Sequence, residues 1–142
     1  MRAPLLTLLC PLLLFSLSSN ANAGTDTDDY ICTIERVSQA TGDVGSTYEL
    51  LNKVFVGRQF TVDRASGVTI GTLKNSLNSK PKVIDPGSSE NSFKAVSAIT
   101  ASQKFPGTLV TALNVMEFVD GEKKPFNYMI NDEVYFGTCV SF

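Results

Sequence analysis

Few of the residue types that usually carry catalysis occur in usable positions in this chain of 142 residues. Histidine is absent, which removes the usual general base at neutral pH and the commonest metal and haem ligand. Cys32 and Cys139 lie near the two ends of the mature chain, and we expect them to form a disulfide, which would leave no thiol nucleophile. Serine nucleophiles at Ser66, Ser88 or Ser89 would lack a histidine partner. The sequence therefore predicts no catalytic residue, no metal site and no cofactor.

Acidic side chains could supply calcium ligands or an acid–base pair, and their sequence settings favour neither role. Asp26, Asp28 and Asp29 are oxygen donors, but the glycine and distal glutamate of a calcium-binding loop are missing. Two carboxylates that catalyse together must face each other across a cleft, and the sequence does not specify such a distance. The candidate pairs are Asp63 with Asp85, and Glu117 with Asp132. We expect these groups to be solvated and the protein to be non-enzymatic.

Basic side chains around residues 58–74 offer a better candidate for a binding site. If Arg58, Phe60, Val62 and Arg64 share one face of a strand, two guanidinium groups bracket an apolar patch. Such an arrangement could grip an anionic ligand or a carboxylate of a partner protein. The simpler interpretation is that basic side chains at strand ends extend outward into solvent. We favour the simpler interpretation and keep Arg58 and Arg64 as candidate binding residues.

The first 23 residues have the pattern of a signal peptide. Arg2 gives a positive start, residues 5–17 are almost wholly apolar, and Ala21 and Ala23 form the small-x-small motif that signal peptidase reads. The apolar run is too short to span a bilayer and no second candidate follows it, so we expect no stable membrane insertion. Cys10 leaves with this leader. We therefore expect residues 24–142 to be a single β-rich domain, secreted or periplasmic in a bacterium.

The charge and composition of the mature chain argue against a nucleic-acid partner. Loss of Arg2 with the leader reduces 12 basic residues to 11 against 14 acidic ones, a net charge of about −3. A nucleic-acid partner is not expected, because phosphate binding needs a concentrated basic face. The apolar fraction is ordinary for a globular protein, so a core is available. We expect the partner to be a protein or a small ligand of the cell envelope.

Residues 58–74 have the clearest hairpin pattern. Phe60 and Val62 alternate with polar residues, which is the period of a half-buried strand, and a turn at residues 64–67 follows. Gly67 suits the positive φ that closes such a turn. On the returning strand, Val68 and Ile70 alternate with Thr69 and Gly71.

Other strands are expected along the rest of the chain. The segments are 30–37, 93–100, 109–119, 126–130 and 133–140, with 81–92 a long connection and turns at 120–121 and 131–132. In residues 93–100, the shared face contains Phe93, Ala95, Ser97 and Ile99. Residues 109–119 are apolar on both faces, which is typical of a central or sandwiched strand. Tyr128 and Tyr135 are expected as core or cross-strand neighbours.

Residues 47–56 are the one ambiguous segment. Their apolar residues recur at helical spacing, Ser46 or Thr47 could cap a helix, and Gly57 could end it. A strand with a bulge fits almost as well, and we favour a short helix. Taken with seven or eight short strands, this predicts an all-β fold, a small antiparallel barrel or sandwich with one disulfide. A bond between the first and last strands would close about 100 residues and stabilise the fold by about 4–5 kcal/mol.

Two resemblances bear on function. The segment 55–67, with 71–75 after it, resembles small secreted β-rich proteins of proteobacteria that have no assigned function, which implies a cell-envelope setting. The segments 30–32 (Tyr-Ile-Cys) and 65–67 (Ala-Ser-Gly) resemble those of periplasmic inhibitors of C-type lysozyme, small β-barrels whose Ser-Gly hairpin enters the enzyme's cleft. No tyrosine follows Ser-Gly here, and the family's second block with its lysine is not identifiable. Only Ser66 is carried over from this resemblance, as a candidate binding residue.

These observations predict a non-enzymatic binding protein for a ligand or partner in the cell envelope. The alternative is a protein inhibitor of an envelope hydrolase such as lysozyme. A hollow interior lined by apolar side chains would favour a ligand binder. A filled interior with a protruding rigid hairpin would favour an inhibitor.

Overall fold

The computed structural model describes residues 28–77, 79–102 and 106–142, and the predicted leader lies outside these ranges. Within them the chain forms one α-helix and eight β-strands. In chain order the elements are β1 (Tyr30–Gln39), α1 (Gly45–Phe55), β2 (Gln59–Val62), β3 (Thr69–Gly71), β4 (Lys82–Pro86), β5 (Phe93–Ile99), β6 (Leu109–Val115), β7 (Lys124–Ile130) and β8 (Glu133–Ser141).

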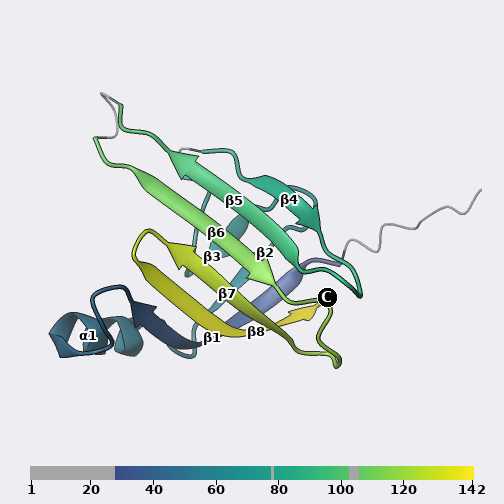
Figure 1. Ribbon diagram of the computed structural model, residues 1–142, viewed down its shortest axis with the longest axis horizontal. Coiled ribbons are helices and arrows are strands. Elements are labelled where there is room, and N and C mark those ends of the chain that lie inside the picture. The colour runs from purple at the N-terminus through teal and green to yellow at the C-terminus, as the bar shows by residue number, and fades with distance from the viewer. Residues whose placement is uncertain (1–27, 78, 103–105) are drawn as a thin grey trace, which may run out of the picture.

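All eight strands belong to one antiparallel sheet that curls into a half-barrel (Figure 1). The strand order is β3-β2-β1-β8-β7-β6-β5-β4, so β3 and β4 are the two edges of the sheet. The all-β prediction is confirmed. Of the two predicted architectures, the structure has the barrel-like one, because a single curled sheet supplies the core.

The first and last strands pair at the centre of the sheet. β1 and β8 form its longest ladder, in which Cys32 lies directly opposite Cys139, and the two form a disulfide. The predicted bond between terminal strands is therefore confirmed. The β1 register shifts between Ile34 and Arg36, and here Gly137 approaches so closely that a side chain would collide with the Thr33 carbonyl oxygen.

Large side chains fill the concave side of the sheet. The alternation predicted for β5 is confirmed, since Phe93, Ala95, Ser97 and Ile99 are all buried. Tyr128 lies directly opposite Tyr135 in the β7–β8 ladder, as core and cross-strand neighbours. The largest buried side chains are Tyr30, Phe60, Phe93, Phe126, Tyr128 and Tyr135. The interior is therefore packed with aromatic rings.

The helix preferred for residues 47–56 is present as α1, which lies beside one end of β1 (Figure 1). Its Phe55 ring packs edge-on against Tyr135, with 5.1 Å between ring centroids. The helix ends before Gly57, which has a φ of +81°. The capping prediction was wrong: Val44 precedes the first turn and makes no side-chain hydrogen bond to it. Helix α1 is thus held mainly by packing.

Residues 81–92 are not one connection, because β4 occupies the first part of this segment. β4 pairs with β5 along one side only. Pro86 is tolerated at its end, since an edge strand leaves a backbone position without a ladder partner. The turn that follows occupies residues 87–92.

In β3 the polar residue of the alternation, not the apolar one, points into the core. Ile70 is 59% exposed whereas Thr69 is fully buried. The Thr69 amide donates to Asn75 Oδ1 at 2.9 Å, and its hydroxyl lies 3.3 Å from the Tyr128 hydroxyl. In the β2–β3 ladder Thr69 lies opposite the buried Val62 and Ile70 lies opposite Thr61, so the register that buries Val62 also turns Thr69 inward.

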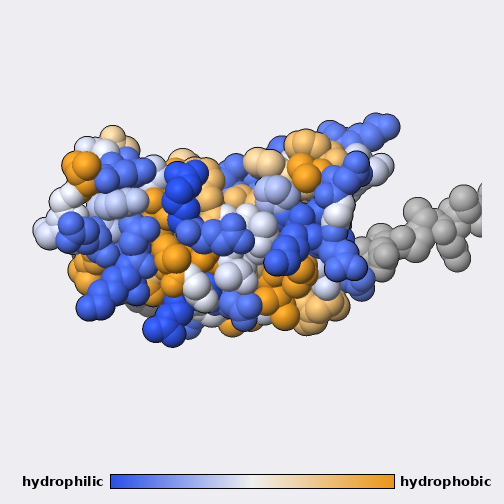
Figure 2. Space-filling view, turned by 90° about the horizontal axis from the view of Figure 1, so that it is seen from below, coloured by the Kyte–Doolittle hydropathy of each residue, from blue (hydrophilic) through white to orange (hydrophobic). Residues whose placement is uncertain are grey.

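β6 is central, between β5 and β7, but it is not sandwiched. Val110 is 48% exposed, because all the strands in the described residues belong to one sheet and none of them covers its outer face. The regular strand also ends at Val115, before the predicted limit. Figure 2 shows apolar residues left at the surface among hydrophilic ones.

Candidate functional site

The two candidate arginines do not bracket a surface patch. Phe60 and Val62 are buried in the core, as predicted from their alternation. Arg58 is exposed just before β2. Arg64 follows β2 and therefore lies beyond the opposite end of the strand from Arg58. The two arginines do not form one site.

The turn between β2 and β3 is held by several hydrogen bonds. The Ser66 amide donates to Asp63 Oδ1 and the Gly67 amide to the Asp63 carbonyl, each at 2.8 Å. The Val68 amide donates to Ser66 Oγ at 3.2 Å. Gly67 has the predicted positive φ, +73°, and a side chain there would also meet Ala95 Cβ at 2.8 Å. The turn is pre-organised, and it lies against β5 instead of protruding.

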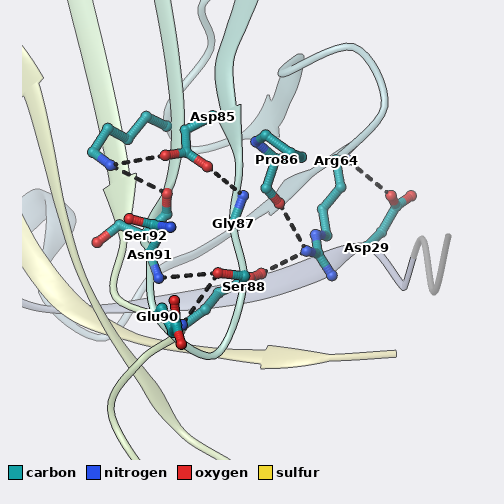
Figure 3. A network of polar contacts seen from close by, with 11 residues as sticks. Asp29, Arg64, Asp85, Pro86, Gly87, Ser88, Glu90, Asn91 and Ser92 are labelled. Atoms are coloured by element: carbon teal, nitrogen blue, oxygen red, sulfur yellow. Dashed lines mark hydrogen bonds and ion pairs between the residues drawn. The ribbon is translucent and has the colours of Figure 1, made fainter. Parts of the chain in front are cut away.

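Arg64 joins this turn to the far edge of the sheet (Figure 3). Its guanidinium forms an ion pair with Glu117 at 2.6 Å and donates to the Pro86 carbonyl oxygen at 3.0 Å. Its backbone amide donates to Asp29. The side chains of Arg64 and Glu117 are only 17% and 12% exposed. The expectation that Arg64 extends outward was therefore wrong, because carbonyl and carboxylate acceptors hold it inside.

Asn75 makes a second connection, between the β2–β3 hairpin and β5, which the sequence did not indicate. Its side-chain amide donates to the Gly67 carbonyl oxygen at 2.8 Å and accepts from the Thr69 amide. Its backbone carbonyl accepts from Ser97 Oγ on β5 at 3.2 Å. The Asn75 side chain thus satisfies backbone groups of Gly67 and of Thr69 in β3 that would otherwise be buried without partners.

A groove of about 550 Å³ opens between the β2–β3 turn and the chain that leads into β4. We call it the seam groove. Its walls contain Ala65, Ser66 and Val68 on one side and residues 80–83 on the other. Of the three candidate binding residues, only Ser66 lines it. Lys80 and Lys82 are both exposed.

A smaller pocket of about 360 Å³ lies on the Arg64 side of the same turn. We call it the end pocket. Its lining includes Tyr30, Arg64, Ser88, Glu117 and Lys124. Burial raises the pKa of the Glu117 carboxyl, and the positive charge of Lys124 opposes that rise. The sequence did not place these residues together, because they come from five separate segments.

Three of the four carboxylates considered as acid–base pairs have separate partners. Asp63 holds its own turn, and Glu117 pairs with Arg64. Asp85 accepts from the Gly87 amide and from Lys94, contacts that lower its pKa. Asp132 lies in the β7–β8 turn.

The acidic stretch is described only in part, since Asp26 lies outside the described residues. Asp28 is exposed, and Asp29 accepts from Arg64. Across residues 28–77, 79–102 and 106–142, no group of three or more acidic, histidine or cysteine side chains is placed to hold a metal ion. Ser88 Oγ caps its own turn by accepting from two backbone amides.

Comparison of the chain with protein-family models, with curated proteins and with solved structures gives no match. No helix in the described parts of the chain is long and apolar enough to cross a membrane. The Cys32–Cys139 disulfide is compatible with an oxidising, extracytoplasmic compartment. The geometry of the seam groove and the end pocket is therefore the basis for a functional proposal.

Proposed function

We propose that this is a secreted or periplasmic, non-enzymatic binding protein, and that its seam groove holds a short, extended, acidic segment of a partner protein. The observation that carries the proposal is the groove of about 550 Å³ beside the edge strand β4. The predicted leader and the disulfide support an exported protein, whose partner would share its compartment.

The edge position of β4 favours an extended segment. Among the strands that the structure describes, β4 pairs only with β5, and an unpaired strand edge is a template for another strand. Val83 of β4 and Pro81 before it provide apolar wall, and Ala65 and Val68 face them from the hairpin. An incoming strand could pair through its backbone and place alternate side chains against these walls.

The charge at the groove favours an acidic segment. Lys80 and Lys82 lie on its rim in a chain whose expected mature charge is about −3. Ser66 and Ser76 add hydroxyl groups to the lining. Charges at the edge of an interface mainly steer and select the partner, so acidic side chains are the complementary choice.

Peptide titration tests the proposal. The probes are a short synthetic peptide of alternating Glu and Val and its counterpart of alternating Lys and Val, added to isotope-labelled protein. We expect the acidic peptide alone to shift the NMR amide signals of Ser66 and Val83. Changing Lys80→Glu together with Lys82→Glu should weaken binding by about tenfold, from two rim charges worth about 0.5–1 kcal/mol each.

The matched control is Lys74→Glu with Lys123→Glu, which makes the same charge change at two exposed sites outside the groove. This control should bind the acidic peptide nearly as well as the unaltered protein. The proposal is wrong if the acidic peptide shifts signals elsewhere only, or if both double variants lose binding equally.

The β2–β3 turn supports a second candidate function, the inhibition of an envelope hydrolase such as lysozyme. Ser66 is exposed on a turn that hydrogen bonds hold rigid, and a rigid loop suits an inhibitor. The turn does not protrude, which favours the groove. Lysis of bacterial cell walls by C-type lysozyme, with and without the protein, tests this candidate. Inhibition that Ser66→Ala abolishes would favour it over the groove.

A further inference from the structure

Helix α1 carries an exposed apolar face that the fold does not use. The helix lies at one end of the molecule, beside β1 (Figure 1). Leu51 and Phe55 pack half-buried against the core, whereas Leu50 and Val54, also one turn apart, are 58% and 45% exposed. An eleven-residue helix is marginal in water without packing, and no residue of α1 is fully buried. A partner on the face of Leu50 and Val54 would therefore stabilise the helix.

Apolar residues also flank α1 at both of its ends, at equal distances from its midpoint. Val44 precedes the first turn and is 78% exposed, and Val56 follows the last turn and is 40% exposed. Leu50 is the middle residue of Gly45–Phe55. In an antiparallel pair of identical helices related by a two-fold axis, residues equally far from the midpoint lie opposite each other. Such a pair would place Leu50 against Leu50 of the second copy, and each Val44 beside Val56 of the other copy.

The remaining side chains of this face are complementary to themselves in the same arrangement. Ser46 and Val54 are equally far from Leu50, so the branched Val54 of one copy faces the small Ser46 of the other. Glu49 and Lys53 are exposed, lie on one flank of the apolar face, and form no ion pair within the described residues. In the antiparallel pair, Glu49 of each copy lies about 3 Å along the helix axis from Lys53 of the other, on the same flank. The face is therefore self-complementary in size and in charge.

We infer that α1 pairs antiparallel with α1 of a second copy of this chain, in a two-fold symmetric dimer. The apolar side chains supply the contact, and the two Glu49–Lys53 pairs between the copies fix its register and orientation. The helix is about 16 Å long, too short to bury the roughly 800 Å² per partner of a stable complex. The dimer is therefore weak and forms reversibly. The inference is independent of the seam groove, which no residue of α1 lines.

Sedimentation equilibrium of the full mature chain tests the pairing, from about 10 μM to about 1 mM, where weak complexes dissociate. We expect dimer to accumulate with concentration, and the NMR amide signals of Leu50 and Val54 to shift over the same range. Leu50→Ser should weaken association about tenfold or more, because both central leucines are lost. Ile70→Ser is the matched control, since Ile70 is 59% exposed on β3 and should leave association unchanged.

A charge exchange between copies separates pairing from any change within one helix. Glu49→Lys and Lys53→Glu each place like charges together across the dimer, so each variant alone should associate more weakly. A mixture of the two variants should associate as heterodimers, because each helix then meets its complement.

The inference is wrong if the protein stays monomeric over the whole range, or if Leu50→Ser and Ile70→Ser associate alike. It is also wrong if the mixture of charge variants associates no better than either variant alone. Phosphatidylcholine vesicles probe the other occupant of an apolar helix face. Signals of α1 that respond to these vesicles and not to protein concentration would show that the face docks on lipid, and would overturn the dimer.

Discussion

Asn75→Ala should destabilise the fold more than its position in a connecting segment suggests. The Asn75 side chain is 2% exposed and bonds the Thr69 amide at 2.9 Å and the Gly67 carbonyl oxygen at 2.8 Å. Alanine leaves both backbone groups buried without partners, and each such group costs roughly 1–3 kcal/mol. Partial entry of water recovers some of this, so we expect a loss of about 2–4 kcal/mol in the free energy of unfolding.

Equilibrium unfolding in urea, with the disulfide intact, measures this loss from the shift in midpoint at constant slope. Asn91→Ala is the control, because Asn91 is exposed in the turn after β4 and should change stability by less than about 0.5 kcal/mol. Asn75→Asp keeps the acceptor for Thr69 but loses the donor to Gly67, so it should also destabilise. If Asn75→Ala falls within about 0.5 kcal/mol of the unaltered protein, the argument that this side chain holds the start of β3 is refuted.

Three further outcomes follow from the packing at the centre of the sheet. Gly137→Ala should cost at least about 3 kcal/mol, because its methyl group would collide with a backbone oxygen of β1, and a thermal melt within a few degrees of the unaltered protein would contradict this. Replacing Cys32 and Cys139 by serine opens a loop with a sequence separation of 107 residues and should cost about 4–5 kcal/mol in urea unfolding, whereas a loss under about 1 kcal/mol would argue against the loop-entropy account. Burial raises the pKa of Tyr128 and of Tyr135, so the stability they contribute is present below about pH 10 and is lost as the pH rises through their folded pKa values. Ultraviolet titration should therefore show both phenols ionising together with unfolding, and ionisation of all four tyrosines in a still-folded protein near pH 10 would contradict the packing.

Local periodicity was enough to predict much of the fold. Phe60 and Val62 point into the core as their alternation indicated, and residues 93–99 present the predicted face. The helix at residues 45–55 and the positive φ of Gly67 were also predictable. The disulfide followed from cysteine count and the predicted leader. Each of these features depends on neighbouring residues or on composition, which a sequence displays directly.

The candidate site could be predicted only in part, because its contacts join segments far apart in the chain. The sequence singled out Arg64 and Ser66, but nothing near Arg64 indicated that Glu117 would hold it, nor that Ser66 would line a groove beside β4. The register of β2 with β3 turns Thr69 inward, where it meets Asn75 and the Tyr128 hydroxyl from across the sheet. Curling of one sheet brings its two edges together, and only then do these side chains find partners. Residue types, spacing and local pattern were therefore determined by the sequence alone, while the tertiary structure decided which polar groups are buried, which charges pair and where the grooves open.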